Sequence, residues 1–302
     1  MSQTHAISAA AAGTVTLGGD LTVNRLGYGA MRITGKGIWG PPEDKAAALA
    51  TLRRAVELGV NLIDTADSYG PYVSEELIAE ALYPYPSGVV IATKAGWERS
   101  GPAQWLHNAS PKHLTEALEG SLKRLRLERI DIYQLHIPDP AVDYNATMET
   151  LAALRQQGKI RHVGLSNVTQ EHIERGRKIV PIVSVQNRYG FADREWDYVV
   201  NYCEQHGIAF LPWAPLGQNR KAHEILEKVA KELGATPQQT ALAWLLNRSP
   251  IMLPIPGTSS SAHLEENIAA AALQLPDAAF TELSSVSPTP VSYRISGVVA
   301  KA

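Results

Sequence analysis

Four titratable side chains lie at or shortly after the ends of three short apolar runs of the sequence. The first run is followed by Asp64 and Tyr69, the second ends at Lys94, and the third is followed by His136. If these runs are parallel strands of one sheet, their carboxyl ends lie at the same edge and the four groups converge. We therefore expect a carboxylate, a phenol, an amine and an imidazole to meet in space.

Such a set suits proton delivery to an oxygen that gains negative charge as hydride arrives at carbon. A charged lysine beside a buried phenol favours the phenolate, so Lys94 is expected to lower the pKa of Tyr69. Asp64 holds the ammonium charged and in place. A tyrosine whose pKa is lowered in this way can donate a proton near neutral pH. Free tyrosine, with its pKa of about 10, does so poorly. His136 can orient the substrate oxygen through a hydrogen bond.

Each of the four residues also has an ordinary structural interpretation. Asp64 could be a turn or cap residue, and Tyr69 could pack in its loop beside Gly70. Lys94 could be a surface lysine, and His136 could be a histidine satisfied within the core. Because all four lie at equivalent positions of successive strands, the catalytic interpretation is favoured for the group as a whole.

The elements that would position these residues alternate along the chain. A Gly18-Gly19 turn between two β-type runs predicts an N-terminal hairpin. About eight apolar runs follow, each with a helical segment behind it. Ser110 and Thr236, both followed by proline, mark two helix starts. The strands are expected at 26–29, 61–63, 89–92, 130–135, 160–165, 182–185, 208–213 and 251–255, with further C-terminal helices at 261–272 and 276–283.

This alternation predicts an α/β fold, namely a (β/α)8 TIM barrel with an N-terminal β-hairpin and extra C-terminal helices. An open doubly wound sheet is the alternative. A dinucleotide site in that fold would need Gly-x-Gly-x-x-Gly after an early strand, and residues 27–32 (GYGAMR) lack the third glycine. We expect one domain over residues 1–302, with residues 1–13 as a flexible tail.

Composition narrows the classes of function. The 302 residues are 45% hydrophobic and 19% charged with a formal net charge of -2, so a large core is possible and no basic nucleic-acid surface is expected. The single cysteine, Cys203, fits a reducing compartment. Neither a signal peptide, a membrane-spanning run nor a metal-ligand motif is found. We expect a cytoplasmic protein with a small-molecule partner and no metal, and we leave its oligomeric state open.

Six segments of the sequence resemble those of the aldo-keto reductase superfamily, in order and spread over nearly the whole chain. They are residues 59–70 (GVNLIDTADSYG), 91–94 (IATK), 131–136 (DIYQLH), 158–167 (GKIRHVGLSN), 185–187 (VQN) and 213–217 (WAPLG). The resemblance implies a barrel that uses a nicotinamide cofactor to reduce a carbonyl. It also implies a catalytic tetrad of Asp64, Tyr69, Lys94 and His136, with Tyr69 as the general acid.

The resemblance further implies where the cofactor lies. Ser166, Asn167 and Gln186 match the residues that hold the nicotinamide carboxamide, which needs both hydrogen-bond donors and acceptors. Trp213 matches an aromatic ring that stacks on the nicotinamide. The remaining implied contacts near the ribose and pyrophosphate are Met31, Pro215, Leu216, Gly217 and Gln218.

The segment after the last strand bears on the choice between NADP(H) and NAD(H). It places hydroxyls and backbone N–H groups at a helix N-terminus, which favours phosphate binding. The implied contacts there are Gly257, Thr258, Ser259, His263, Glu266 and Asn267. Many members of the superfamily carry lysine at the position of Gly257 and arginine at that of His263, and this chain has neither. Because branches with this Gly-Thr-Ser-Ser pattern still favour NADPH, we expect NADP(H) rather than NAD(H).

Three tryptophans, Trp39, Trp97 and Trp105, fall on segments expected to rim the mouth of the barrel. They predict a pocket for a flat or aromatic carbonyl, with ordinary loop packing as the alternative for each. Residues 39–43 and 67–71 resemble the pyridoxal reductase branch. We therefore expect NADPH-dependent reduction of a small aldehyde or ketone, with pyridoxal among the candidate substrates.

Two other functions stay open from the sequence. The first is a regulatory or binding subunit that senses the nucleotide and turns over little, as the potassium-channel beta subunits resemble this family. The second is a barrel aldolase that uses Lys94 as a Schiff-base nucleophile. The aldolase would leave the residues matched to the nicotinamide site without a role.

Overall fold

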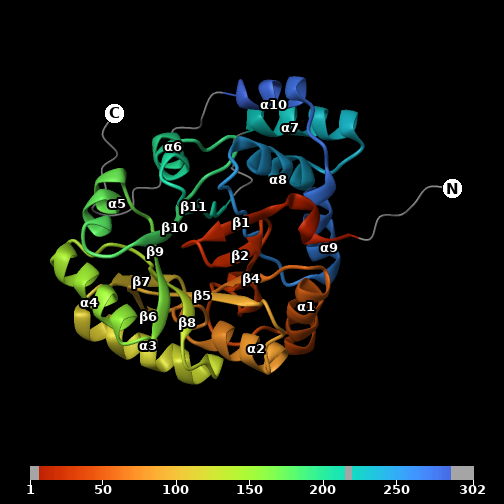
Figure 1. Cartoon of the computed structure of the whole chain (residues 1–302). Helices are drawn as coiled ribbons and strands as arrows, with labels where there is room; N and C mark the ends of the chain where they lie inside the picture. Colours follow the sequence, from red (N-terminus) through yellow and green to blue (C-terminus); the bar gives the residue numbers. More distant parts are fainter. Residues whose placement is uncertain (1–6, 215–219, 287–302) are drawn as a thin grey trace.

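The computed structural model describes residues 7–214 and 220–286 of the chain. A curled sheet of parallel strands forms its centre, in the order β11-β10-β9-β8-β5-β4-β3, and helices surround it (Figure 1). The strands are β3 (Tyr28–Gly29), β4 (Leu62–Asp64), β5 (Val90–Ala95), β8 (Ile130–Leu135), β9 (Ile160–Ser166), β10 (Ile182–Gln186) and β11 (Ala209–Phe210). Each is short and apolar and is followed by a helix, as the alternation of the sequence predicts.

Residues 251–256 close this sheet into a barrel. On one side, the N–H of Leu253 donates to the carbonyl of Phe210 at 2.8 Å, and on the other the N–H of Gly27 donates to the carbonyl of Pro254 at 2.9 Å. The segment was expected to be a regular strand, but Pro254 and Pro256 have no N–H to donate. The sequence therefore closes the barrel with an extended segment, and the predicted (β/α)8 barrel is confirmed.

Helices cover the outside of the barrel, and most of them begin at the side chains that predicted them. Ser110 caps α3 and a capping box of Thr236 and Gln239 opens α8. Two other residues that favour a helix start in the sequence, Pro41 and Ser74, do not begin one. Helix α1 begins behind Asp44, and Ser74 lies inside α2, where its hydroxyl donates to a backbone carbonyl. The helices are α1 (Lys45–Glu57), α2 (Val73–Leu82), α3 (Pro111–Leu125), α4 (Tyr144–Gln156), α5 (Gln170–Arg177), α6 (Asp197–Gln205), α7 (Arg220–Leu233), α8 (Pro237–Arg248), α9 (Ser261–Ala269) and α10 (Asp277–Ser284), with short 3-10 turns η1 (Ala9–Ala12), η2 (Ala30–Ile33) and η3 (Ala270–Ala272).

The predicted N-terminal hairpin forms and plugs the amino end of the barrel. Its strands are β1 (Thr14–Leu17) and β2 (Leu21–Asn24), paired in antiparallel fashion. Leu17 and Val23 are fully buried and share one apolar cluster with the first residues of two barrel strands, Leu62 and Val90. A second, larger cluster lies between the strands and the helices. The polar ends of the strands are thus left at the opposite mouth.

The flexible tail expected for residues 1–13 does not extend over residues 7–13. Ser8 caps the short turn η1, and Ala9 is fully buried with its N–H bonded to the carbonyl of Leu58 at 2.8 Å. The alanine-rich stretch therefore packs against the end of α1.

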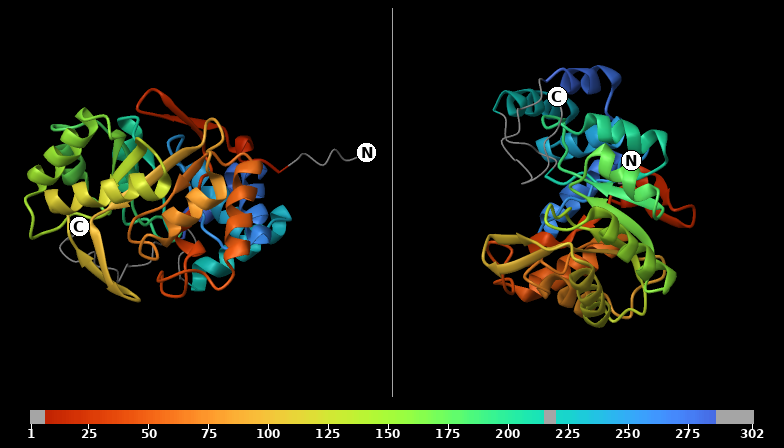
Figure 2. Two further views of the ribbon diagram at one scale, coloured as in Figure 1. Left: turned by 90° about the horizontal axis from the view of Figure 1, so that it is seen from below. Right: turned by 90° about the vertical axis from the view of Figure 1, so that its left-hand side faces the viewer.

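A second antiparallel hairpin lies between β5 and α3, where the sequence had suggested only loops. It consists of β6 (Trp97–Gly101) and β7 (Gln104–His107) and extends away from the barrel body (Figure 2). Its exposed and half-buried residues alternate. This hairpin carries two of the three tryptophans expected at the mouth.

Candidate active site

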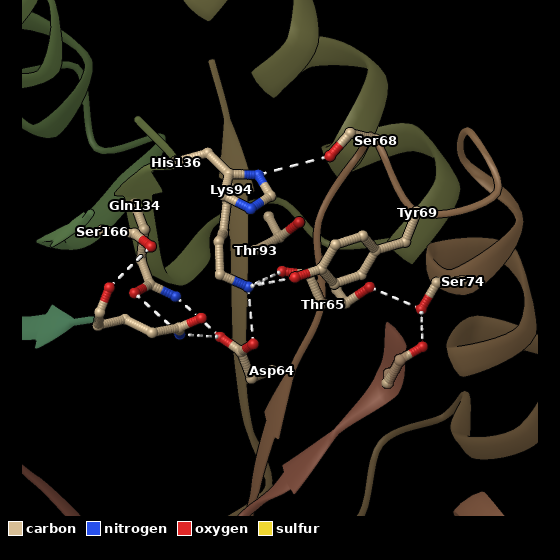
Figure 3. A network of polar contacts seen from close by, with 12 residues as sticks. Asp64, Thr65, Ser68, Tyr69, Ser74, Thr93, Lys94, Gln134, His136 and Ser166 are labelled. Carbon is tan, nitrogen blue, oxygen red and sulfur yellow. Dashed lines mark hydrogen bonds and ion pairs between the residues drawn. The ribbon is translucent and has the colours of Figure 1, made fainter. Parts of the chain in front are cut away.

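The structure brings the four predicted catalytic side chains together at the carboxyl ends of the strands (Figure 3). Asp64 ends β4, Lys94 lies near the end of β5, and His136 directly follows β8. Tyr69 reaches the same point from the loop after β4, with its ring edge-to-face with that of His136 at 5.7 Å between centroids. All four are buried. We refer to them as the tetrad.

Lys94 is the centre of the tetrad and has three acceptors for its three N–H donors. Its Nζ lies 2.7 Å from Oδ2 of Asp64, 2.8 Å from the carbonyl of Thr65 and 3.4 Å from Oη of Tyr69. Burial alone would lower the pKa of Lys94, but the charges and hydrogen bonds of Asp64 and Tyr69 outweigh it and raise that pKa. The ammonium is therefore charged although the side chain is fully buried.

Two glutamines hold the Asp64 carboxylate from the other side. Gln134 donates from Nε2 to Oδ1 of Asp64 at 2.9 Å, and Gln186 donates to the same oxygen at 3.0 Å. Gln134 was not among the predicted site residues, although a glutamine within an otherwise apolar strand is itself a signal. Gln186 was predicted to bind the nicotinamide carboxamide. In the structure the nitrogen of that side chain is engaged by Asp64, which leaves its oxygen as the acceptor.

The phenol of Tyr69 does not have the lowered pKa that we predicted. Burial raises the pKa of Tyr69, and the opposing effect of Lys94 is smaller. Tyr69 is thus a protonated phenol at neutral pH. Lys94 contributes by stabilising the phenolate once the proton has left, because its ammonium already lies beside the oxygen.

His136 is a neutral imidazole in this setting. Burial, together with the positive charge of Lys94, places the pKa of His136 well below its ordinary range. Its Nδ1 lies 3.4 Å from the hydroxyl of Ser68. A neutral imidazole offers one N–H and one lone pair, so His136 can donate to a substrate oxygen through one nitrogen while the other faces Ser68.

The residues expected to hold the nicotinamide lie next to the tetrad. Ser166 ends β9 and donates from its hydroxyl to the carbonyl of Gln186 at 2.9 Å. Asn167 follows with a left-handed backbone (φ 58), which asparagine tolerates better than most residues. Its Nδ2 donates to the carbonyl of His136 at 3.0 Å. The three predicted side chains are thus joined to one another and to the tetrad.

The predicted phosphate contacts lie on one cavity in part only. Met31, Gly257, Thr258 and Ser259 line a cavity of about 580 Å³ between η2, the β6–β7 hairpin and the segment before α9. His263, Glu266 and Asn267 lie on α9, outside this lining. Trp213 follows β11, with the guanidinium of Arg188 5.9 Å from the centre of its ring. The expected contacts Pro215, Leu216, Gly217 and Gln218 fall outside the described residues.

Two of the three predicted tryptophans contact Arg99, which was not among the predicted site residues, and the third contacts one of these two rings. Trp97 lies 6.4 Å from the ring of His136 and 5.8 Å from that of Trp105. The Arg99 guanidinium stacks on Trp105 at 3.7 Å and faces Trp39 at 5.6 Å. The three rings and the Arg99 guanidinium therefore form one cluster next to the tetrad.

Arg99 also ties three loops together through its N–H groups. It donates to carbonyls of the loop after η2, of the loop that carries Tyr69, and of its own hairpin. These carbonyls belong to Gly37, Ile38, Ser68, Gly101 and Gln104. All five donors of a guanidinium can be used in this way, so Arg99 is a positioning residue rather than a free charge.

A buried acidic cluster lies behind the tetrad. Glu75 pairs with Arg124 at 2.6 Å and accepts from the hydroxyl of Thr93 at 2.6 Å. Asp67 is buried nearby, and its Oδ1 has no hydrogen-bond partner among the described residues. Burial and the neighbouring Glu75 raise the pKa of Asp67 well above its usual range. The folded protein therefore disfavours the ionised form of Asp67 relative to the unfolded chain.

Residues 7–214 and 220–286 contain neither a candidate metal cluster nor a candidate membrane-spanning helix. No three side chains of histidine, cysteine, aspartate or glutamate are placed so that they could hold a metal ion. Similarly, no helix there has the length and apolar character needed to cross a bilayer.

The sequence matches the Aldo/keto reductase family over residues 25–288. An uncharacterised oxidoreductase of Schizosaccharomyces pombe is 51% identical over 92% of this chain and 91% of its own length. The pyridoxine 4-dehydrogenase of Escherichia coli is 46% identical over 91% of this chain and 98% of its own. An aldo-keto reductase of Klebsiella pneumoniae, crystallised with NADPH, superposes with a TM-score of 0.77 at 26% identity, covering 92% of this chain and 95% of that one.

Proposed function

Because this chain belongs to the aldo/keto reductase family, we propose that it is an NADP(H)-dependent oxidoreductase that reduces the carbonyl of a small aldehyde to an alcohol. The observation that carries the proposal is the buried sequence of contacts from Asp64 through Lys94 to Tyr69, at 2.7 Å and 3.4 Å. These contacts place a charged ammonium beside the phenol of Tyr69, where it stabilises the phenolate that forms when the proton leaves.

The residues present fit a nicotinamide dinucleotide. Gly29 and Gly257 approach so closely that a Cβ at position 257 would lie 2.5 Å from the carbonyl oxygen of Gly29. Without side chains at these two positions, the backbone of β3 packs directly against the segment before α9, whose Gly257 lines the cavity. Thr258 and Ser259 add hydroxyls in front of α9, where backbone N–H groups favour phosphate. When bound, NADPH would supply the hydride.

Tyr69 acts as the general acid in this proposal. As the carbonyl carbon accepts hydride, its oxygen gains charge and takes the proton from Oη of Tyr69. The C=O π bond becomes a C–O single bond and the O–H bond of the phenol breaks. The remaining phenolate lies beside the Lys94 ammonium, which Asp64 keeps charged and in place. In the reverse direction the same phenolate accepts the alcohol proton.

His136 orients the carbonyl oxygen beside Tyr69. The imidazole is neutral, so it donates a hydrogen bond without competing as a stronger acid. The edge-to-face contact fixes the two rings relative to each other. Ser166 and Asn167 would hold the nicotinamide carboxamide, since the amide oxygen of Asn167 is left to accept once its nitrogen is bonded to His136.

We infer that the substrate is a flat aromatic aldehyde of the pyridoxal type. Trp97 lies against His136, and Trp105 and Trp39 continue the aromatic lining outward on Arg99. Such rings suit a planar substrate whose carbonyl points down to Tyr69. The Escherichia coli relative named pyridoxine 4-dehydrogenase supports this choice at 46% identity.

The test is the loss of reduced-nicotinamide absorbance with NADPH and, separately, NADH. Pyridoxal, benzaldehyde and methylglyoxal serve as carbonyls, with Tyr69→Phe as the matched control. Turnover of pyridoxal with NADPH that collapses in the variant is the expected result. Binding of NADPH without turnover of any carbonyl would instead support a nucleotide-sensing subunit, and turnover retained by Tyr69→Phe would overturn the role of that residue.

A further inference from the structure

We propose that Arg32, with Lys36 beside it, is the cation site for the 2′-phosphate of NADP(H). The inference rests on the proposed function and deepens it. It assigns the preference between NADPH and NADH to the loop after the first barrel strand, whereas sequence analysis placed that preference in the segment before α9.

Arg32 is positioned over the segment that sequence analysis linked to the phosphate. It lies in η2, directly after β3, and its Cγ is 3.6 Å from where a Cβ at Gly257 would stand. The Arg32 side chain therefore packs beside Gly257 at the wall of the cavity that both residues line. Arg32 and Lys36 both line the 580 Å³ cavity with Thr258 and Ser259.

The packing explains why the charge comes from this loop. Since a Cβ at position 257 would meet the carbonyl oxygen of Gly29 at 2.5 Å, no side chain fits there without moving the backbone of β3. His263, the other position discussed for this role, is exposed on α9 and outside the lining. A cation for a phosphate at Thr258 and Ser259 must therefore reach them from the facing wall.

Both cations are available to a ligand. Within residues 7–214 and 220–286, neither the Arg32 nor the Lys36 side chain forms a hydrogen bond or ion pair, and both are exposed. The described lining includes no carboxylate, so these two residues give the cavity a net positive charge. Arg99, close by, has its donors committed to carbonyls and contrasts with them.

The arrangement suits a dianionic phosphate. A guanidinium binds phosphate oxygens through two parallel N–H donors, and Lys36 adds a compact charge. The hydroxyls of Thr258 and Ser259 and the N-terminus of α9 supply the remaining donors. NADH carries a ribose hydroxyl at this position, so it would gain nothing from Arg32. The two cofactors should thus differ in affinity through this side chain.

The test measures equilibrium dissociation constants for NADPH and NADH by nicotinamide fluorescence, without any carbonyl substrate. In Arg32→Gln we expect the constant for NADPH to rise about ten- to a hundredfold, as for loss of a charge-assisted hydrogen bond, with that for NADH nearly unchanged. Arg32→Lys should recover part of the loss. Lys112→Gln removes an exposed lysine far along the chain on α3 and serves as the charge control.

Competition by adenosine 2′,5′-bisphosphate and by 5′-AMP supplies a second readout. Arg32→Gln should weaken the bisphosphate and not 5′-AMP, and the double variant with Lys36→Gln should bind NADPH no more tightly than NADH. Equal losses for NADPH and NADH would place Arg32 at the pyrophosphate and overturn the proposal, as would an unchanged NADPH constant. If wild-type protein binds neither nucleotide, the proposed function fails as well.

Discussion

Gln134 donates to one oxygen of the Asp64 carboxylate, at 2.9 Å, while Lys94 binds the other oxygen at 2.7 Å. The register of the sheet places both side chains beside Asp64, since Gln134 on β8 is paired with Lys94 on β5. Gly164 on the next strand makes room, because a Cβ there would lie 2.9 Å from Cγ of Gln134. The carboxylate that anchors the lysine is therefore itself anchored.

We expect Gln134→Leu to weaken both stability and turnover. The variant leaves a buried carboxylate oxygen with one donor fewer, which costs about 1–3 kcal/mol in the free energy of unfolding. Because Lys94 is then held less firmly, kcat should fall while the KM for the aldehyde changes little. Gln134→Glu serves as the isosteric control, and it should be worse than leucine since it places a second carboxyl group on Asp64. A fully active, fully stable leucine variant would contradict the anchoring role.

Removing the Lys94 charge or the Tyr69 hydroxyl should abolish most of the turnover, and loss of the hydroxyl should not weaken cofactor binding. Lys94→Met leaves a buried Tyr69 whose phenolate has no cation, so we expect kcat to fall by about 10²–10⁴-fold. Tyr69→Phe should fall at least as far. Dissociation constants for NADPH, measured by fluorescence, should stay close to wild type in Tyr69→Phe. Parallel loss of binding and of kcat in that variant would point to a collapsed site instead.

Asp67→Asn is expected to stabilise the protein at neutral pH. The pKa of Asp67 is raised in the folded state, so folding costs free energy wherever the unfolded carboxyl is ionised, above its ordinary value of about 4. This cost is absent below that pH and grows as the pH rises toward the folded-state pKa. The amide removes it, and the gain in thermal midpoint should be present at pH 7 and shrink near pH 4.

The same scan separates this effect from a general improvement in packing. If the gain in midpoint for Asp67→Asn were equal at pH 4 and pH 7, titration of this carboxyl would not be its cause. A loss of stability at pH 7 would show that the ionised form has a partner that the described contacts do not include. Glu128→Gln, at an exposed carboxyl just before β8, is the control.

Arg99→Gln should affect substrate binding more than the chemical step. It removes donors from carbonyls of three loops, including that of Ser68, and leaves Trp39 and Trp105 without their shared cation. We expect KM for an aromatic aldehyde to rise about tenfold, equivalent to roughly 1.4 kcal/mol, with a smaller change in kcat. Arg99→Lys should not restore it, because an ammonium cannot make the same planar set of contacts.

Arg53→Gln is a matched control for the Arg99 variant, since Arg53 also donates to a carbonyl, that of Ala81, away from the mouth. It should leave KM unchanged. Tryptophan fluorescence of Arg99→Gln should shift as well, because two of the indoles lose their stacked partner. An unchanged spectrum together with an unchanged KM would remove Arg99 from the substrate mouth.

The tetrad could be predicted because its position depends only on where apolar strands end. Asp64, Lys94 and His136 each follow a run that is unmistakable in the sequence, and parallel strands bring such ends together. Gln134 could not be found in this way. Its role depends on the register between β5 and β8 and on the space left by Gly164, which are properties of the folded sheet.

The pKa of Tyr69 and the role of Arg99 were missed for related reasons. Charge pairing with Lys94 is visible from spacing, whereas the extent of burial that overrides it is not. In β6 the polar residues Glu98 and Ser100 stand on either side of Arg99. The hairpin therefore lacks the alternation of apolar and polar residues that predicts a strand. Only the folded hairpin shows that Arg99 faces carbonyls from three separate parts of the chain.

The hairpin of β1 and β2 fills the amino end of the barrel with Leu17, Leu21 and Val23. Its turn is fastened from outside, where Asp20 meets His162 at 2.6 Å and Arg161 at 3.0 Å. With that end sealed, the carbonyl substrate and the alcohol product of the proposed reaction would share the mouth beside Trp97. Substrate entry and product release would then use a single opening, and slow release of the alcohol would limit turnover however fast the proton transfer is.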